Sequence, residues 1–246
     1  MIFRPERASP YTVHVHEEPP LVLPRGLIFL ASIWLVVSWA VAIGFRTPVE
    51  ASSASYTPGV RLMLISAAIG LIIGWPLLRV SQSRAEYPLT QTLLDLIVLL
   101  ALVQVVIWPL RLVTPWSPAR TAALDATLVA WTILAGALVA SATGSERTGP
   151  RNIAIIACVT MCLVGPVLAL IGVRGSAMSG LTPRLLQVGP LLEIFTLSHG
   201  GRTAPTGGQW MWISMVALAG ATAWTGLITI TIMRGRTPRV GPEQPT

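Results

Sequence analysis

Six blocks of about twenty apolar residues dominate the pattern of hydrophobic and polar positions along this chain. They cover residues 26–45, 60–78, 93–110, 122–142, 153–173 and 210–233. A hydrocarbon core of ~30 Å needs about twenty helical residues to cross it. Inside lipid an α-helix satisfies every backbone N–H and C=O group within its own segment, and no block shows the alternation of a membrane β-barrel strand. The sequence therefore predicts an all-α, polytopic membrane bundle of six transmembrane helices.

The residues outside these blocks are divided among two tails and five connections, none long enough for a soluble domain of about 100 residues. Residues 1–25 contain five prolines and are predicted to form an extended N-terminal tail, because proline removes a backbone donor and blocks helix interiors. Residues 26–236 are interpreted as the transmembrane domain and residues 237–246 as a C-terminal tail. No removable secretory signal is expected, because the first apolar block is longer than the usual signal core.

Arginine supplies all 17 basic residues, and the formal net charge is +7. The arginines stand near the ends of the blocks, where they anchor and orient membrane helices, and no basic stripe interleaved with aromatic residues indicates a nucleic-acid partner. With a cytoplasmic N-terminus, ten arginines fall inside and seven outside; Arg234, Arg236 and Arg239 follow the last block and disfavour its translocation. We therefore expect both termini in the cytoplasm, and a multi-pass protein surrounded by lipid in the cytoplasmic (inner) membrane.

The absence of lysine excludes two kinds of chemistry for this chain alone. A P-loop needs its lysine to reach the phosphates of ATP, and Schiff-base chemistry needs an ε-amine. The sequence contains no HExxH, GxSxG or GxGD-like motif, and no cluster of metal ligands within the apolar blocks. We therefore expect a protein that is not an enzyme and has no cofactor and no metal, so that another subunit would hydrolyse any ATP it uses.

Three polar side chains fall inside the predicted spans. A carboxylate in hydrocarbon is costly unless it is paired, hydrated or protonated, so Asp95 and Asp125 are candidates for function. Each is also expected in the first turn of its helix, where a carboxylate complements the helix dipole and a structural role suffices. Gln104 lies nearer the middle of its span and is expected to make an interhelical hydrogen bond or to line a polar path.

Two further features belong to the fifth and sixth spans. Gly165-Pro166 falls near the middle of block 153–173, where proline should kink the helix, either as a hinge or as packing geometry. The connection 174–209 is the longest and is predicted to be external. It contains the apolar stretch 191–197, which includes Glu193 and is too short to cross a membrane. This stretch suits a re-entrant or interfacial helix, and we expect a gate or external lid here.

The tryptophans fall into two groups according to their position in the predicted spans. Those near the predicted span ends are interpreted as interface anchors, with the ring buried and the N–H wet: Trp75, Trp108, Trp116, Trp210 and Trp212. Those lying deeper need a hydrogen-bond partner or a protein contact: Trp34, Trp39, Trp131 and Trp224. Small residues four positions apart, such as Gly136 and Ala140, favour close helix packing or a dimer.

The layout resembles the membrane subunit of an ABC-2-type exporter: six spans with cytoplasmic ends, and a long external segment with a short apolar helix before the last span. The resemblance covers most of the chain from Gly26 to Arg236, and Gly189-Pro190 with the apolar stretch after it is the closest local match. It implies a homo- or hetero-dimer in which each subunit docks a separate ATPase, here through the loop from Arg79 to Thr90. The chain departs from the family before the first span, where a proline-rich region replaces the amphipathic interface helix.

Three hypotheses about function follow. The first is the permease subunit of an ABC-2-type exporter, driven by a separate ATPase subunit. The second is an accessory or scaffold subunit of a larger membrane complex, for which apolar spans and small-residue faces would suffice. The third is an ion-coupled carrier in which Asp95 or Asp125 titrates. No motif identifies a transported substrate.

Overall fold

The computed structural model describes residues 24–45, 52–82, 87–145, 148–170 and 189–235. Within these ranges the regular structure is entirely helical, as the sequence predicts. The elements in chain order are α1 (Arg25–Trp39), η1 (Ala40–Gly44), α2 (Ser53–Ile69), η2 (Gly70–Gly74), α3 (Trp75–Ser81), α4 (Pro88–Leu110), α5 (Pro118–Thr143), α6 (Thr148–Leu170), α8 (Pro190–His199) and α9 (Gly207–Gly235), where η denotes a π-helical turn.

Six helical stretches in the described part of the chain are long and apolar enough to cross a membrane, which is the number that the sequence predicts. They are Arg25–Gly44, Ser53–Ser81, Pro88–Leu110, Pro118–Thr143, Thr148–Leu170 and Gly207–Met233. In two of them a π-helical turn continues the α-helix, so that α1 with η1, and α2 with η2 and α3, each form one span. This architecture is that of a multi-pass membrane protein.

All six spans begin before their apolar blocks, and in three of them capping residues or prolines before the block start the helix. Ser52 caps α2 through a reciprocal capping box with Ser55. Pro88 and Pro118 occupy the first turns of α4 and α5, where the missing N–H costs nothing, and Ser117 accepts a hydrogen bond from the backbone of α5. Counted from these starts, Asp95 and Asp125 are each the eighth residue of their helix. The expectation that they occupy the first turn is therefore wrong.

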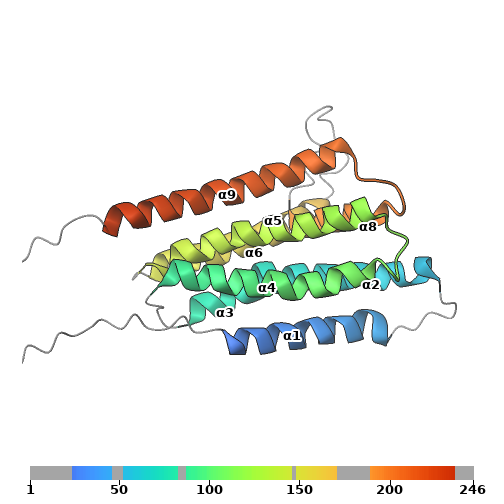
Figure 1. Ribbon diagram of the computed structural model, residues 1–246, viewed down its shortest axis with the longest axis horizontal. Coiled ribbons are helices and arrows are strands. Elements are labelled where there is room, and N and C mark those ends of the chain that lie inside the picture. Colours follow the sequence, from blue (N-terminus) through green and yellow to red (C-terminus); the bar gives the residue numbers. More distant parts are fainter. Residues whose placement is uncertain (1–23, 46–51, 83–86, 146–147, 171–188, 236–246) are drawn as a thin grey trace, which may run out of the picture.

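Helix α5 is the central element of the bundle. It packs against α3, α4, α6, α8 and α9, and it is the most buried of the six spans. In Figure 1, α9 lies along one side of the bundle and α1 along the opposite side. The start of α1 and the end of α9 lie at the same end of the bundle, as an even number of spans requires (Figure 1).

The short helix α8 belongs to the hydrophobic core. Its Ile194 and Leu197 have no exposed surface, and they join apolar side chains of α2, α4 and α5 in one cluster. Helix α8 packs on α2, α5 and α6. Ten helical residues span about 15 Å, half of a ~30 Å hydrocarbon core, so α8 enters the bundle without crossing it. This packing favours the re-entrant alternative over the interfacial one, and the choice between them stays a prediction.

Hydrogen bonds from deep indoles attach the outer helices to the core. Trp34 on α1 donates to the carbonyl of Ser66 at 3.2 Å, and Trp224 on α9 donates to the carbonyl of Ile133 at 3.0 Å. These bonds are of the kind predicted for the deeper tryptophans. The interface interpretation is wrong for Trp75, which is 2% exposed, and it is also wrong for Trp116 (see below).

The packing of α9 on α5 can be tested with two glycines of α9. A Cβ on Gly220 would lie 3.0 Å from the side chain of Ile133, whereas a Cβ on Gly226 would meet nothing within 4 Å. Gly220→Leu should therefore push α9 away from α5 and destabilise the fold by about 1–3 kcal/mol, the usual cost of overpacking. Gly226→Leu is the matched control, and thermal unfolding of the purified protein in detergent is the measurement. Equal melting temperatures of the two variants would contradict this contact.

Candidate functional site

Helix α8 begins deep in the bundle, against α6. Its N-cap Gly189 has φ +123°, a left-handed backbone conformation that glycine adopts without strain. A Cβ at this position would lie only 3.2 Å from the carbonyl oxygen of Met161. Since α6 ends at Leu170, the contact with Met161 and Gly165 places the start of α8 about 8–14 Å inside that end of α6, at 1.5 Å per residue.

A buried carboxyl group lies in the first turn of α8. Glu193 is 6% exposed, and the indole N–H of Trp131 on α5 donates to its Oε2 at 2.9 Å. The hydroxyl of Thr127 lies 3.4 Å from its Oε1. The indole N–H of Trp212 on α9 is buried next to the same carboxyl group without the geometry of a hydrogen bond. Among the described residues, no arginine forms an ion pair with Glu193.

The surroundings of Glu193 bear on its protonation. The Thr127 hydroxyl donates to the carbonyl of Ala123 at 2.8 Å, the shorter of its two contacts, so its hydrogen bond to Oε1 of Glu193 at 3.4 Å is weak. A buried carboxylate without a countercharge is costly in an apolar environment. We therefore expect a neutral Glu193 that can bind and release a proton.

The other end of α8 is held by α5. The guanidinium of Arg120, which is 3% exposed, donates from Nη1 to the carbonyl of Leu197 and from Nε to the carbonyl of Thr203 at 2.8 Å. The indole of Trp116 donates to the carbonyl of Ser198 at 3.2 Å. The last carbonyls of a helix have no partner within the helix and carry partial negative charge, so these donors satisfy and complement them.

Arg61 on α2 approaches the same end of α8. Its Nε donates to the hydroxyl of Ser198 at 2.8 Å, and its guanidinium lies 5.1 Å from the centre of the Phe195 ring. Its Nη1 lies 3.1 Å from Nε2 of His199. Because arginine only donates, Nε2 accepts and Nδ1 carries the ring proton, which it gives to the carbonyl of Phe195 at 2.8 Å. Two guanidinium groups thus hold the C-terminal end of α8.

Helix α8 therefore runs antiparallel to α5. Glu193 in its first turn meets the middle of α5 at Thr127 and Trp131, and Leu197 near its end meets Arg120 at the start of α5. The carboxyl side chain lies near the N-terminus of α8, and the guanidinium groups lie at its C-terminus, where positive charge is favourable for the helix dipole. This arrangement brings the candidate residue Glu193 into a site that Asp95, Gln104 and Asp125 do not share.

Asp95 lies in a different polar cluster, on α4. It is 2% exposed and forms an ion pair with Nε of Arg79 on α3 at 3.4 Å, and the side chain of Gln91 donates to it at 3.2 Å. Arg79 is interpreted from the sequence as a residue that orients the span, but its side chain points into the bundle and is 10% exposed. A buried carboxylate with a paired guanidinium needs no functional explanation.

Gln104 and Asp125 form a third polar cluster, between α4 and α5. The side-chain amide of Gln104 donates to Oδ1 of Asp125 at 2.6 Å and accepts a hydrogen bond from the indole of Trp108 at 2.8 Å. The interhelical hydrogen bond expected for Gln104 is therefore present. The two residues that the sequence treats as separate candidates are one hydrogen-bonded pair, which joins neighbouring helices within the membrane.

Pro166 lies next to the point where the start of α8 contacts α6. It lies inside the continuous helix α6, directly after Gly165, whose backbone nitrogen would lie 3.6 Å from a Cβ on Gly189. Proline removes the hydrogen bond to the carbonyl of Cys162, four residues earlier. The missing backbone hydrogen bond in α6 therefore lies where α8 enters the bundle. A hinge at Pro166 stays a prediction.

The sequence interpretation missed Arg61, Trp116, Arg120, Thr127 and Trp131 as partners of α8. It treats both arginines as membrane anchors and Trp116 as an interface residue, although Trp116 is 5% exposed. The sequence did contain one indication that Arg120 is not a simple membrane anchor. Arg120 lies in the first turn of α5, where the helix dipole disfavours a cation, so a guanidinium there needs acceptors from elsewhere.

Comparisons with known proteins gave no further guide to this site, since no protein-family model, curated protein or solved structure matches the chain. In the part of the chain that the structure describes, no three His, Cys, Asp or Glu side chains gather into a group that could hold a metal ion. The chemistry available at α8 is that of a buried carboxyl group, three indoles and two guanidinium groups.

The neutral state of Glu193 can be tested by infrared spectroscopy at neutral pH. A protonated carboxyl group has a C=O stretch that ionised carboxylates lack, and we expect this band in the wild type and its loss in Glu193→Gln. Asp95→Asn is the matched control, because the ion-paired Asp95 should be ionised and should not contribute to the band. A band that persists unchanged in Glu193→Gln would show that Glu193 is charged.

The anchoring of α8 by Arg120 can be tested at Gly200. A Cβ on Gly200 would lie 2.0 Å from the guanidinium carbon of Arg120, so Gly200→Ala should displace the guanidinium from the carbonyl of Leu197. A hydrogen bond to a charged group contributes about 1.5–3 kcal/mol. Faster amide hydrogen exchange is therefore expected across residues 190–204.

The matched control is Gly207→Ala, because a Cβ on Gly207 meets nothing within 4 Å. Exchange in this variant should follow the wild type. Exchange that is equally fast in both variants would mean that Arg120 does not hold α8.

Proposed function

We propose that this chain is the membrane-embedded permease subunit of a transporter and that a separate ATPase subunit drives it, in the manner of the ABC-2-type exporters whose layout it resembles. The observation that carries the proposal is α8. Between the fifth and sixth spans, this chain has a half-length helix that packs into the bundle. The exporter layout includes such a helix, whereas a bundle of six simple spans would lack it.

The physical cost of such a helix supports a role in transport. Helix ends within the membrane expose backbone groups that lipid cannot satisfy, and interrupted helices at membrane depth occur where they are buried in protein or line a path. Transporters place their binding sites beside such half-helices. Helix α8 begins beside Met161 and Gly165 of α6 and carries Glu193 in its first turn, next to α5 and α9.

The proposed orientation places the shared end of α1 and α9 in the cytoplasm of a cell with this protein in its inner membrane. The end of α3, the start of α4, the end of α5 and the start of α6 lie at that same end, and they are the proposed docking surface for the ATPase. The C-terminal end of α8 then lies at the outer face. Since the sequence contains no lysine, the P-loop belongs to the partner subunit. A homo- or hetero-dimer is part of this proposal.

A second function, an ion-coupled carrier, is favoured by one observation. The sequence suggests Asp95 or Asp125 as the titrating group, but both have strong partners in the structure. Glu193, which is buried without an arginine partner among the described residues, is the better candidate for carrying a proton. A carrier of this kind would need no ATPase, which separates it from the first proposal.

Purification of the tagged chain from its native membrane in mild detergent tests the proposed function. The expected result is a stoichiometric P-loop ATPase in the purified complex. Gly200→Ala, which loosens α8, should change the ATP hydrolysis rate of that complex, whereas Gly207→Ala should not. Recovery of the chain without any ATPase would overturn the permease proposal. Other integral membrane subunits in its place would favour the scaffold hypothesis, and the chain alone would favour the carrier.

A further inference from the structure

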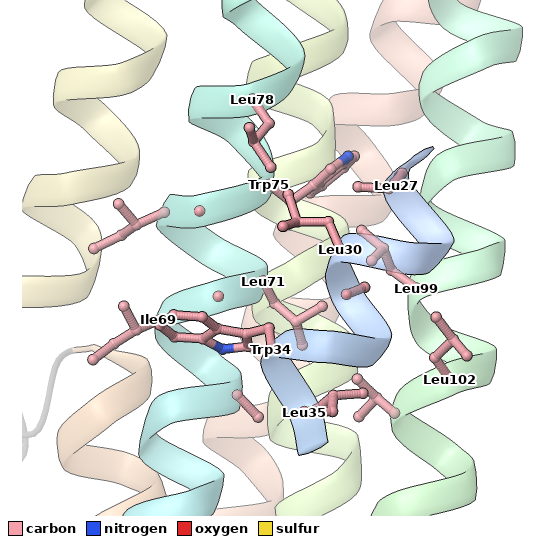
Figure 2. Close-up of a pocket in the computed structure, with 16 residues that line it drawn as sticks. Leu27, Leu30, Trp34, Leu35, Ile69, Leu71, Trp75, Leu78, Leu99 and Leu102 are labelled. Atoms are coloured by element: carbon pink, nitrogen blue, oxygen red, sulfur yellow. The ribbon is translucent and has the colours of Figure 1, made fainter. Parts of the chain in front are cut away.

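A pocket of about 230 Å³ lies beneath α1, on the side of the bundle away from α8 and α9. Its walls come from α1, from the continuous span formed by α2, η2 and α3, and from α4 (Figure 2). The labelled side chains in Figure 2 are leucine, isoleucine and tryptophan, and they extend along α1 from Leu27 to Leu35. The pocket shares no residue with the candidate site at α8.

The lining of the pocket selects an apolar ligand. Every lining residue is apolar, glycine or tryptophan. The indole N–H of Trp34 is used by the carbonyl of Ser66, and the indole N–H of Trp75 is buried next to the carboxyl group of Asp95. Apolar cavities do not hold water, and a cavity of about 150 Å³ is enough to bind a molecule of the size of benzene. This pocket is larger, and hydrocarbon is the ligand chemistry that it fits.

The pocket is open to the surface that faces lipid. Its floor consists of buried side chains such as Leu71 and Leu99, which are 5% and 4% exposed. Its rim consists of exposed ones such as Leu30 and Trp34, which are both 44% exposed. A hydrocarbon chain can therefore enter sideways from the bilayer without crossing a polar surface.

The backbone of the second span contributes to the volume of the pocket. The π-helical turn η2 (Gly70–Gly74) lies at the level of the pocket, and it begins and ends with glycine residues that line the pocket. Ala31 on α1 and Ala67 on α2 also line it. Small side chains on facing helices leave the volume that larger ones would fill, and π-helical turns in membrane and soluble helices are frequent at functional sites.

The depth of the pocket matches one leaflet of the bilayer. From Arg25, the first residue of α1, to Leu35 at the far end of the lining is ten residues, or about 15 Å of helix. This is half of a ~30 Å hydrocarbon core. Arg25 is exposed at the same end of α1 as the lining residue Leu27, where the head groups of that leaflet lie. A guanidinium there is complementary to an anionic phosphate.

We propose that this pocket binds one acyl chain of an anionic phospholipid, with the phosphate head group at Arg25 and the chain extending along α1 toward Leu35. The inference does not rest on the proposed transport function. It assigns the space beneath α1 to a bound lipid that holds the outer helix α1 against α2 and α4.

Photolabelling in liposomes tests the proposal. The probe is phosphatidylglycerol with a diazirine on its acyl chain, and labelled positions are identified by mass spectrometry. In the wild type we expect labelling of the buried floor at Leu71 and Leu99, besides labelling of lipid-facing positions such as Ile153, which is 68% exposed on α6. Ala31→Phe fills the pocket and should reduce floor labelling several-fold, while labelling of Ile153 stays unchanged.

The control variant is Val36→Phe, because Val36 lies on the same helix, is 63% exposed and does not line the pocket. It should leave floor labelling unchanged. Ala67→Leu fills the pocket from α2 and should act like Ala31→Phe, so the test does not depend on the folding of one variant. Floor labelling that is absent in the wild type, or equal in all three variants, would overturn the proposal.

A separate experiment tests whether Arg25 binds the phosphate head group. The same diazirine on phosphatidylcholine should label the floor less than phosphatidylglycerol does, and Arg25→Gln should remove that difference. Equal floor labelling by the two lipids in the wild type would overturn the assignment of the phosphate to Arg25 and leave an acyl-chain pocket without head-group selection.

Discussion

The last turn of a helix leaves carbonyl groups without partners in the helix, and where that turn is buried in protein, water cannot satisfy them. In this protein the guanidinium of Arg120 and the indole of Trp116 supply the missing donors to Leu197 and Ser198 at the end of α8. The placement of α8 depends on these bonds, and so does the position of Glu193 opposite Trp131. The buried arginine is in turn acceptable only because three carbonyl oxygens and a hydroxyl surround it.

The carboxyl groups inside the bundle have three different partners. Asp95 has a guanidinium partner, and Asp125 has a side-chain amide that an indole in turn supports. Glu193 has an indole donor and no arginine partner among the described residues. Amide and indole N–H groups are neutral donors, so they stabilise a carboxylate less than a guanidinium does and leave the protonated form accessible. Of the two groups with neutral donors, Glu193 is the more buried.

Hydropathy predicted the spans because a membrane helix needs about twenty consecutive apolar residues. This requirement can be checked from neighbouring residues in the sequence alone. The apolar stretch 191–197 likewise predicted a short helix, and the amide of Gln104 predicted an interhelical bond. The partners of α8 were not predictable in the same way. Arg120 and Leu197 are 77 residues apart, and hydropathy assigns an arginine to the membrane surface whether or not a distant helix provides acceptors for it.

The helix starts were missed for a related reason. Ser52, Pro88 and Pro118 are not apolar, so an apolar window excludes them although their capping and first-turn geometry begins the helices. The shift matters for Asp95 and Asp125, which lie a full turn farther into their helices than the apolar blocks imply. Beyond the first turn the helix dipole no longer complements a carboxylate, so each needs a partner from another residue, and both have one.

The connection of α8 to earlier parts of the chain has a consequence for biosynthesis. Arg61, Trp116, Arg120 and Trp131 all precede α8 in the sequence, as does Gly165 at its entry point. The ribosome therefore makes the receiving surface before it makes the helix that docks there. Helix α8 can fold directly onto partners that are already in the membrane, and its polar ends need not wait in lipid for α9 to emerge.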